Sequence, residues 1–186
     1  MEAAGAVPRL RGLPTDALTP SELRAIRALM DSAFGTGEEA FADDDWAHAL
    51  GGQHFILDVG GLIVSHASVV RRALEIGGRP SRTGYVEAVA TAPDLQGRGH
   101  GSLVMEAATE HIRSTFELGA LGTGRHAFYE RLGWQTWQGP AFVRLAHGEQ
   151  RTPEEEGYIL VLRTAASPPF DLAEPISCDW RPGDVW

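Results

Sequence analysis

A glycine-rich loop between a strand-like run and a helix-like run carries the clearest chemistry in this sequence. The run 86–92 contains β-branched residues and stops at Pro93 and Asp94. The segment Gln96–Ser102 then has glycine at alternate positions, and apolar residues recur after it at helical spacing. Because glycines let backbone N–H groups approach an anion and a helix N-terminus is partly positive, this arrangement favours phosphate binding. The alternative is a flexible turn that binds no ligand.

Glu87 and Tyr129 are the candidate proton-transfer groups. Glu87 precedes the loop in an apolar strand, where a carboxylate is costly unless it is solvated or paired, so it is a candidate general base, directly or through water. Strand alternation also allows it to lie on a solvated face. Tyr129 lies in 126–134, which reads as a short helix ended by Gly133. Its hydroxyl can donate a proton, or the ring can simply pack on the helix.

Together these two motifs resemble the signatures of the GCN5-related N-acetyltransferases, with the Gln-x-x-Gly-x-Gly pattern at Gln96, Gly99 and Gly101. The resemblance implies an α/β fold with a mixed central sheet flanked by helices, and acetyl-CoA as co-substrate. It implies that a backbone N–H near Val89 polarises the thioester and that Tyr129 protonates the leaving thiolate. The cofactor contacts that it implies are Val89, Thr91, Gln96, Gly97, Arg98, Gly99, His100, Gly101 and Ser102.

A narrower resemblance covers nearly the whole chain and is most specific at the ending 178–186. Together with Asp45-Trp46, 84–87 and 118–121, this segment is similar to the aminoglycoside 2′-N-acetyltransferases. The similarity implies acetylation of an antibiotic 2′-amine and a homodimer. The substrate contacts that it implies are Asp45, Glu87, Ala88, Glu155, Asp184 and Trp186, the last through its α-carboxylate. The chain departs from relatives at two places. Ala40 stands where relatives can have an acid, although Glu39 lies beside it, and the segment 122–124 lacks the serines seen in relatives.

The residues alone also allow readings without a binding role. Each exposed acid can be a solvated surface charge instead of a substrate contact, because exposed ion pairs contribute only about 0–1 kcal/mol. The tail, with Trp180 and Trp186 as anchors, is equally a segment docked on the core. Two other function classes also fit: an acetyltransferase for another polyamine-like or protein amine, and a non-catalytic acyl-CoA-binding module.

The elements that must position these residues follow from capping and turn signals. Thr19, Pro20 and Glu22 predict the start of a helix, and Gly35 is expected to end that helix. Glycine pairs at 60–61 and 77–78 predict hairpins. A strand, helix, strand run from 84 to 121 predicts a parallel pair, hence a mixed sheet. The expected helices are 46–50, 101–116 and one around Tyr129, and the expected strands are 54–59, 62–76, 84–91, 118–121, 134–145 and 158–163. The tail from Ser167 shows no regular pattern, and residues 1–186 read as a single N-acetyltransferase domain.

Charge and cysteine content limit the classes of partner and the compartment that we expect. The net charge of −9 over 186 residues argues against a nucleic acid or an anionic membrane and suits a polycationic amine, or it merely keeps the chain soluble. Cys178 is the sole cysteine and reads as structural, so a reducing, cytoplasmic compartment is expected. The histidines lack metal-ligand spacing, so no metal is predicted. No apolar run is long enough to suggest a leader or a membrane span.

Overall fold

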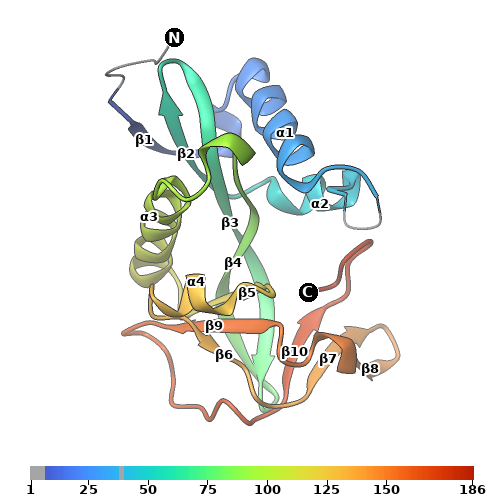
Figure 1. Cartoon of the computed structure of the whole chain (residues 1–186). Helices are drawn as coiled ribbons and strands as arrows, with labels where there is room; N and C mark the ends of the chain where they lie inside the picture. Colours follow the sequence, from blue (N-terminus) through green and yellow to red (C-terminus); the bar gives the residue numbers. More distant parts are fainter. Residues whose placement is uncertain (1–6, 38–39) are drawn as a thin grey trace. The chain divides into compact units, whose positions relative to one another are not determined.

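The computed structural model describes residues 7–37 and 40–186; Glu39 therefore lies outside the described residues. The chain forms two compact units. Unit 1 is Met1–Val70 with Glu87–Ala108, and unit 2 is Arg71–Val86 with Thr109–Trp186. Strands β3 (Leu62–Ile76) and β4 (Arg79–Thr91) form the long hairpin in Figure 1 and, like helix α3 (His100–Thr115), run from one unit into the other.

Unit 1 combines antiparallel strands with helices. Strand β1 (Arg9–Pro14) pairs with β2 (Gln53–Val59), and β2 pairs with β3. The β2–β3 turn is Gly60-Gly61, with φ of 63° and 85°, which confirms the predicted hairpin. Helices α1 (Pro20–Phe34) and α2 (Asp43–Ala49) belong to the unit, together with the first part of α3. Its buried cluster consists of Leu18, Ile26, Leu29, Met30, Ile56 and Ala90.

Helix α1 begins as its sequence predicts. The backbone N–H of Glu22 donates to the Thr19 hydroxyl, and the backbone N–H of Thr19 donates to the Glu22 carboxylate. That backbone donor, followed by the Thr19 hydroxyl and Arg11, lowers the pKa of Glu22 to about 2. Gly35 ends the helix at φ 70°, where glycine is favoured.

Unit 2 is built on a mixed set of strands. The pair β4 and β5 (Leu118–Gly122) is parallel, as the strand, helix, strand run predicts. Strand β9 (Ile159–Arg163) lies antiparallel to β5, and β6 (Gln135–Thr136) lies antiparallel to β9. Strand β10 (Ile176–Asp179) is antiparallel to β3 and parallel to β7 (Ala141–Leu145), which pairs with β8 (Gly148–Arg151). Helix α4 (His126–Glu130) carries Tyr129.

Four expectations need correction. The predicted strand 134–145 is two strands, because the backbone at Gly139 packs against residues 173 and 174. The tail is not irregular throughout, since it contains β10. Strand β1 was not predicted, and β4 begins at Arg79 rather than residue 84. Helix α2 starts at Asp43 rather than 46. Three 3-10 turns, at Thr15–Ala17, Pro93–Leu95 and Pro153–Glu155, complete the described structure.

Two buried histidines in unit 1 make folding sensitive to acid. His54 and His66 are fully buried, with 2.9 Å between Nδ1 of His54 and Nε2 of His66. Burial lowers the pKa of His54 to about 4 and that of His66 to about 3. Below pH 6.5 both histidines therefore bind protons in the unfolded chain but stay neutral in the folded chain, so stability falls as pH decreases.

We expect the free energy of unfolding to drop by roughly 4 kcal/mol between pH 7 and pH 5 from these two groups. Urea denaturation at both pH values measures this change. The double variant His54→Asn, His66→Asn should show a flatter dependence. Identical slopes for variant and parent would mean that another group causes the acid sensitivity.

Candidate functional site

The glycine loop presents backbone rather than side chains. Gly97 and Gly99 have φ of 75° and 83°, and a Cβ built on either would meet no atom of the described residues within 4 Å. The Gln96 side chain closes the loop by donating to the Thr91 carbonyl over 3.2 Å, and the backbone N–H of Leu103 donates to the Gly99 carbonyl over 3.2 Å. The loop is therefore a cradle that is open beside both glycines within the part of the chain that the structure describes.

The start of α3 fits an anion. The first N–H groups of a helix have no acceptor inside the helix and point at whatever lies beyond its N-terminus. His100, the first residue of α3, has a buried Nδ1 atom with no hydrogen-bond partner in the described part of the chain. The positive φ of Gly97 and Gly99, the helix start and this orphaned nitrogen suit a phosphate group, so the residues present fit the pyrophosphate of a coenzyme.

Strand β4 is irregular where it carries the candidate base. Ala88 has φ 50°, a left-handed conformation that is uncommon for a residue with a Cβ. The inward-outward alternation is lost there, because Glu87, Ala88 and Val89 are all half-buried. Such an irregularity turns side chains and N–H groups away from their regular strand directions, as in β-bulges near active sites.

Tyr129 of unit 2 is held by aromatic neighbours. Its ring lies edge-on to Phe128 and Trp134, with centroids 4.9 Å and 6.4 Å away. Burial raises the pKa of Tyr129 to about 12, against a small opposing effect of Arg125. The hydroxyl is therefore protonated at neutral pH. Packing and a proton-donating role are compatible in this position.

Three of the predicted substrate contacts lie together in unit 2. Burial raises the pKa of Glu155, and the nearby charges of Asp184 and Glu154 raise it further. The backbone N–H of Trp186 donates to Asp184 Oδ1 over 3.3 Å, which joins the tail to this acidic group. Because like charges repel, a bound cation would relieve the cost of holding these carboxylates together.

The tail is anchored by one of the two predicted tryptophans. Trp186 is 4% exposed, and its Nε1 donates to the Thr152 hydroxyl over 3.0 Å. Trp180 is 57% exposed, so the expectation that it anchors the tail is wrong. Arg181, which the sequence analysis did not single out, donates to the carbonyl oxygen of Asp184 and to one α-carboxylate oxygen of Trp186. The α-carboxylate of Trp186 therefore has a cationic partner within the tail, whereas the side-chain carboxylate of Asp184 accepts only the Trp186 N–H among the hydrogen bonds described here.

Asp45 of unit 1 has a structural role in addition to any role in binding. Its carboxylate accepts from the backbone N–H of Ala42 over 2.8 Å at the start of α2. The other predicted residues divide between the units: Glu87, Ala88, Val89, Thr91 and 96–102 belong to unit 1, whereas Tyr129 belongs to unit 2.

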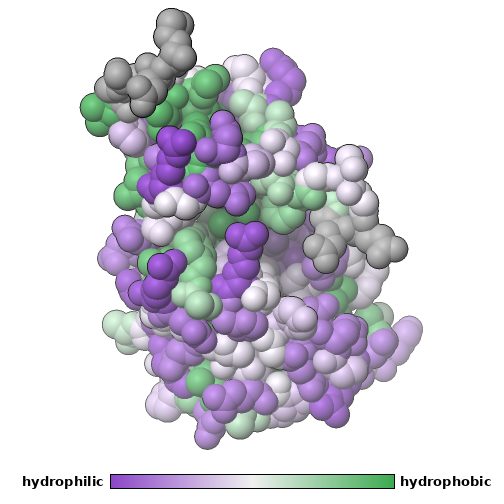
Figure 2. Space-filling view, viewed as in Figure 1, coloured by the Kyte–Doolittle hydropathy of each residue, from purple (hydrophilic) through white to green (hydrophobic). Residues whose placement is uncertain are grey.

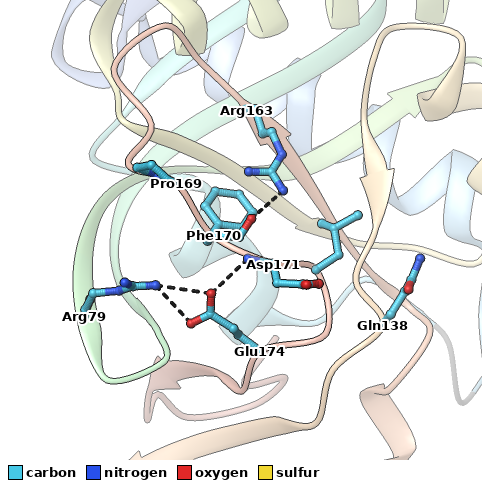
Figure 3. Close-up of a pocket in the computed structure, with 8 residues that line it drawn as sticks. Arg79, Gln138, Arg163, Pro169, Phe170, Asp171 and Glu174 are labelled. Carbon is cyan, nitrogen blue, oxygen red and sulfur yellow. Dashed lines mark hydrogen bonds and ion pairs between the residues drawn. The ribbon is translucent and has the colours of Figure 1, made fainter.

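A hollow of about 590 Å³ in unit 2 contains none of the predicted residues. Figure 3 shows two interactions of Glu174 there: its carboxylate pairs with Arg79 and accepts from the backbone N–H of Asp171. Arg163 lies over the Phe170 ring, 3.7 Å from its centroid, and donates to the Phe170 carbonyl. These contacts fasten the segment before β10, and we assign the hollow a structural role.

Neither a membrane helix nor a metal centre is found in the described residues. No helix within 7–37 or 40–186 is long and apolar enough to cross a bilayer. Over the same ranges, no three His, Cys, Asp or Glu side chains gather as metal ligands would. Figure 2 shows hydrophilic side chains over much of the face in view.

Comparison with known proteins identifies the class. The model of the acetyltransferase (GNAT) domain family matches residues 15–137, which include β4, the glycine loop and Tyr129. The chain therefore belongs to the GNAT acetyltransferase family, and its mixed α/β fold is the fold of that family. It is 42% identical, over 154 residues, to an aminoglycoside 2′-N-acetyltransferase of Mycolicibacterium fortuitum; the match covers 80% of this chain and 78% of that protein.

Solved structures agree on the fold. A GNAT family acetyltransferase from Brucella melitensis in complex with acetyl-CoA has a TM-score of 0.62 at 16% identity, covering 92% of this chain and 96% of that one. YhbS of Escherichia coli, in complex with CoA, has a TM-score of 0.64 at 14% identity, covering 96% and 93%. A Kribbella flavida GNAT protein is longer: the chain covers 34% of it, at 24% identity and TM-score 0.58, with 72% of this chain matched.

Proposed function

We propose that this chain transfers the acetyl group of acetyl-CoA to the 2′-amine of aminoglycosides. The main observation in favour of this substrate is the 42% identity to an aminoglycoside 2′-N-acetyltransferase over most of both chains. The acidic group of Glu155 and Asp184 supports it, because aminoglycosides are polycations. The glycine cradle at the start of α3 supports the coenzyme part of the proposal.

The chemistry assigns one role to each of three groups. The amine nitrogen attacks the thioester carbonyl carbon, and the oxyanion that develops accepts a hydrogen bond from a backbone N–H near Val89. Glu87 removes the proton that the nitrogen must lose, directly or through water. The C–S bond then breaks, and the Tyr129 hydroxyl stabilises the leaving thiolate by hydrogen bonding and proton donation. The products are the amide and CoA.

A thiol-release assay tests the proposal with matched acceptors. We expect CoA release from acetyl-CoA with 2′-amino aminoglycosides and none above background with 2′-hydroxy aminoglycosides. Equal release with both would contradict the assigned position. Release with simple polyamines or peptide amines instead would favour a different acetyltransferase. Coenzyme binding without release for any amine would favour a non-catalytic module.

Asp184 provides a prediction specific to the cationic substrate. Asp184→Asn removes one exposed carboxylate, and we expect the KM for a polycationic aminoglycoside to rise by about 10-fold at low salt, while the KM for acetyl-CoA stays unchanged. The difference should shrink as salt increases, because screening weakens the attraction in the parent enzyme. Steady-state kinetics at two salt concentrations measures both effects.

The matched control is Asp171→Asn, which removes the same charge from an exposed position at the hollow of unit 2. An equal rise in KM for both variants would attribute the effect to net charge rather than to a local contact. Removal of 185–186 is a poorer test, because the Trp186 ring is buried.

We further propose a homodimer, a cytoplasmic location and a single N-acetyltransferase domain over 1–186. The homodimer rests on the resemblance to the family, the location on the sparing use of cysteine, and the single domain on the length of 186 residues. Sedimentation velocity of the purified chain tests the oligomeric state.

A further inference from the structure

A chain of hydrogen bonds between buried side chains in unit 1 ends on the backbone next to Glu87. The Thr15 hydroxyl lies 2.8 Å from Nε2 of His54, and Nδ1 of His54 lies 2.9 Å from Nε2 of His66. Nδ1 of His66 lies 2.8 Å from the carbonyl oxygen of Ala88. Both imidazoles are 0% exposed, and the acetyl-transfer chemistry proposed above uses neither of them.

The carbonyl of Ala88 sets the direction of the whole chain. A carbonyl oxygen only accepts, so Nδ1 of His66 must carry a proton. Neutral His66 then has a bare Nε2, which accepts from a protonated Nδ1 of His54. Neutral His54 has a bare Nε2 in turn, which accepts from the Thr15 hydroxyl. The backbone N–H of Gly51 donates to that hydroxyl over 2.9 Å and closes the sequence.

The chain ends where the backbone of β4 is irregular. Ala88 is the residue with φ 50°, and a left-handed alanine persists only where its surroundings hold it. Two further β3 side chains hold the same stretch: Ser68 donates to the Glu87 carbonyl over 3.2 Å, and Ser65 donates to the Ala90 carbonyl over 3.0 Å. Side chains of β3 thus bind three carbonyls of β4 between residues 87 and 90.

We propose that His54 and His66 are positioning residues for acetyl transfer. By binding the Ala88 carbonyl in a fixed direction, they maintain the left-handed turn of β4 that aims the Glu87 carboxylate and the Val89 N–H at the reacting groups. The inference rests on the proposed function for the roles of Glu87 and Val89. Neither histidine touches substrate or takes a proton in the reaction.

The first test is spectroscopic and independent of activity. Long-range ¹H–¹⁵N NMR of the folded chain at pH 7.5 distinguishes the two neutral tautomers of each imidazole. We expect His54 and His66 both to be protonated at Nδ1, the form that free histidine disfavours. An Nε2-protonated His66 would leave two acceptors facing each other at Ala88 and would overturn the proposal.

The second test compares two substitutions of His66. His66→Leu removes the donor, and we expect kcat to fall by about 10²-fold, as for a misplaced catalytic group, with little change in the KM for acetyl-CoA. His66→Asn places an amide N–H close to the Nδ1 position and should restore kcat to within about 3-fold of the parent. The amide resonance of Val89 should shift in His66→Leu and return in His66→Asn.

Leu29→Ala is the control for loss of stability, because Leu29 is buried in helix α1 of the same unit and takes no part in the series of hydrogen bonds. Its kcat should match the parent while folded. Full activity in a folded His66→Leu, or no rescue by His66→Asn, would refute positioning. If the parent acetylates no amine, the proposed function fails. The tautomers and the Val89 shift still decide whether the hydrogen bonds through His54 and His66 hold β4 in place.

Discussion

Replacing Gly99 with aspartate is expected to weaken acetyl-CoA binding by about 10²-fold or more. Gly99 has φ 83°, and its missing side chain leaves the space in front of the loop free. A carboxylate there would face the pyrophosphate, and juxtaposed like charges cost several kcal/mol, where each 1.4 kcal/mol is about tenfold in Kd. Isothermal titration calorimetry with acetyl-CoA measures the change.

Gly99→Asn separates charge from backbone strain and bulk. Asparagine has nearly the shape of aspartate and tolerates the left-handed region better than most residues. We expect it to bind acetyl-CoA more weakly than the parent but clearly more tightly than Gly99→Asp. Unchanged affinity in a folded Gly99→Asp protein would show that the pyrophosphate binds elsewhere.

Replacing Tyr129 with phenylalanine is expected to lower kcat by about 10²-fold, the low end of the range for general acids. The reason lies in the pKa of about 12 that burial gives the phenol. A thiol has a reference pKa near 8.5, so complete proton transfer to the thiolate is uphill by about 3.5 units, or roughly 5 kcal/mol. In the proposed mechanism, Tyr129 would therefore act mainly by donating a hydrogen bond to the sulfur as charge develops there. Single-turnover kinetics isolates the chemical step.

Tyr158→Phe is the matched control, because Tyr158 is a 52% exposed tyrosine of the same unit. It should turn over like the parent. The Tyr129 hydroxyl should also give no descending limb in the pH–rate profile between pH 7 and pH 10, since it stays protonated there. Full turnover in Tyr129→Phe would leave Tyr129 as a packing residue.

Local patterns predicted what local physics decides. Thr19 and Glu22 satisfy each other's backbone N–H groups within one turn, and Pro20 needs no acceptor at the first helical position, so the start of α1 was predictable. Gly60-Gly61 takes positive φ at both positions because the hairpin twist demands it. The glycine loop was predictable for the same reason: its conformation depends on missing side chains and on the helix that follows it.

The family, the parallel β4–β5 pair and the loop that suits a phosphate could be predicted from the sequence, because each depends on residues close together along the chain. The position of β10 could not, since its four residues acquire strand geometry by pairing with β3 and β7. The tertiary structure likewise decided that Trp186 is buried and Trp180 exposed. The series of hydrogen bonds from Thr15 to Ala88 had no sequence signal, because its partners come from four separate segments and the histidine tautomers follow from one distant carbonyl.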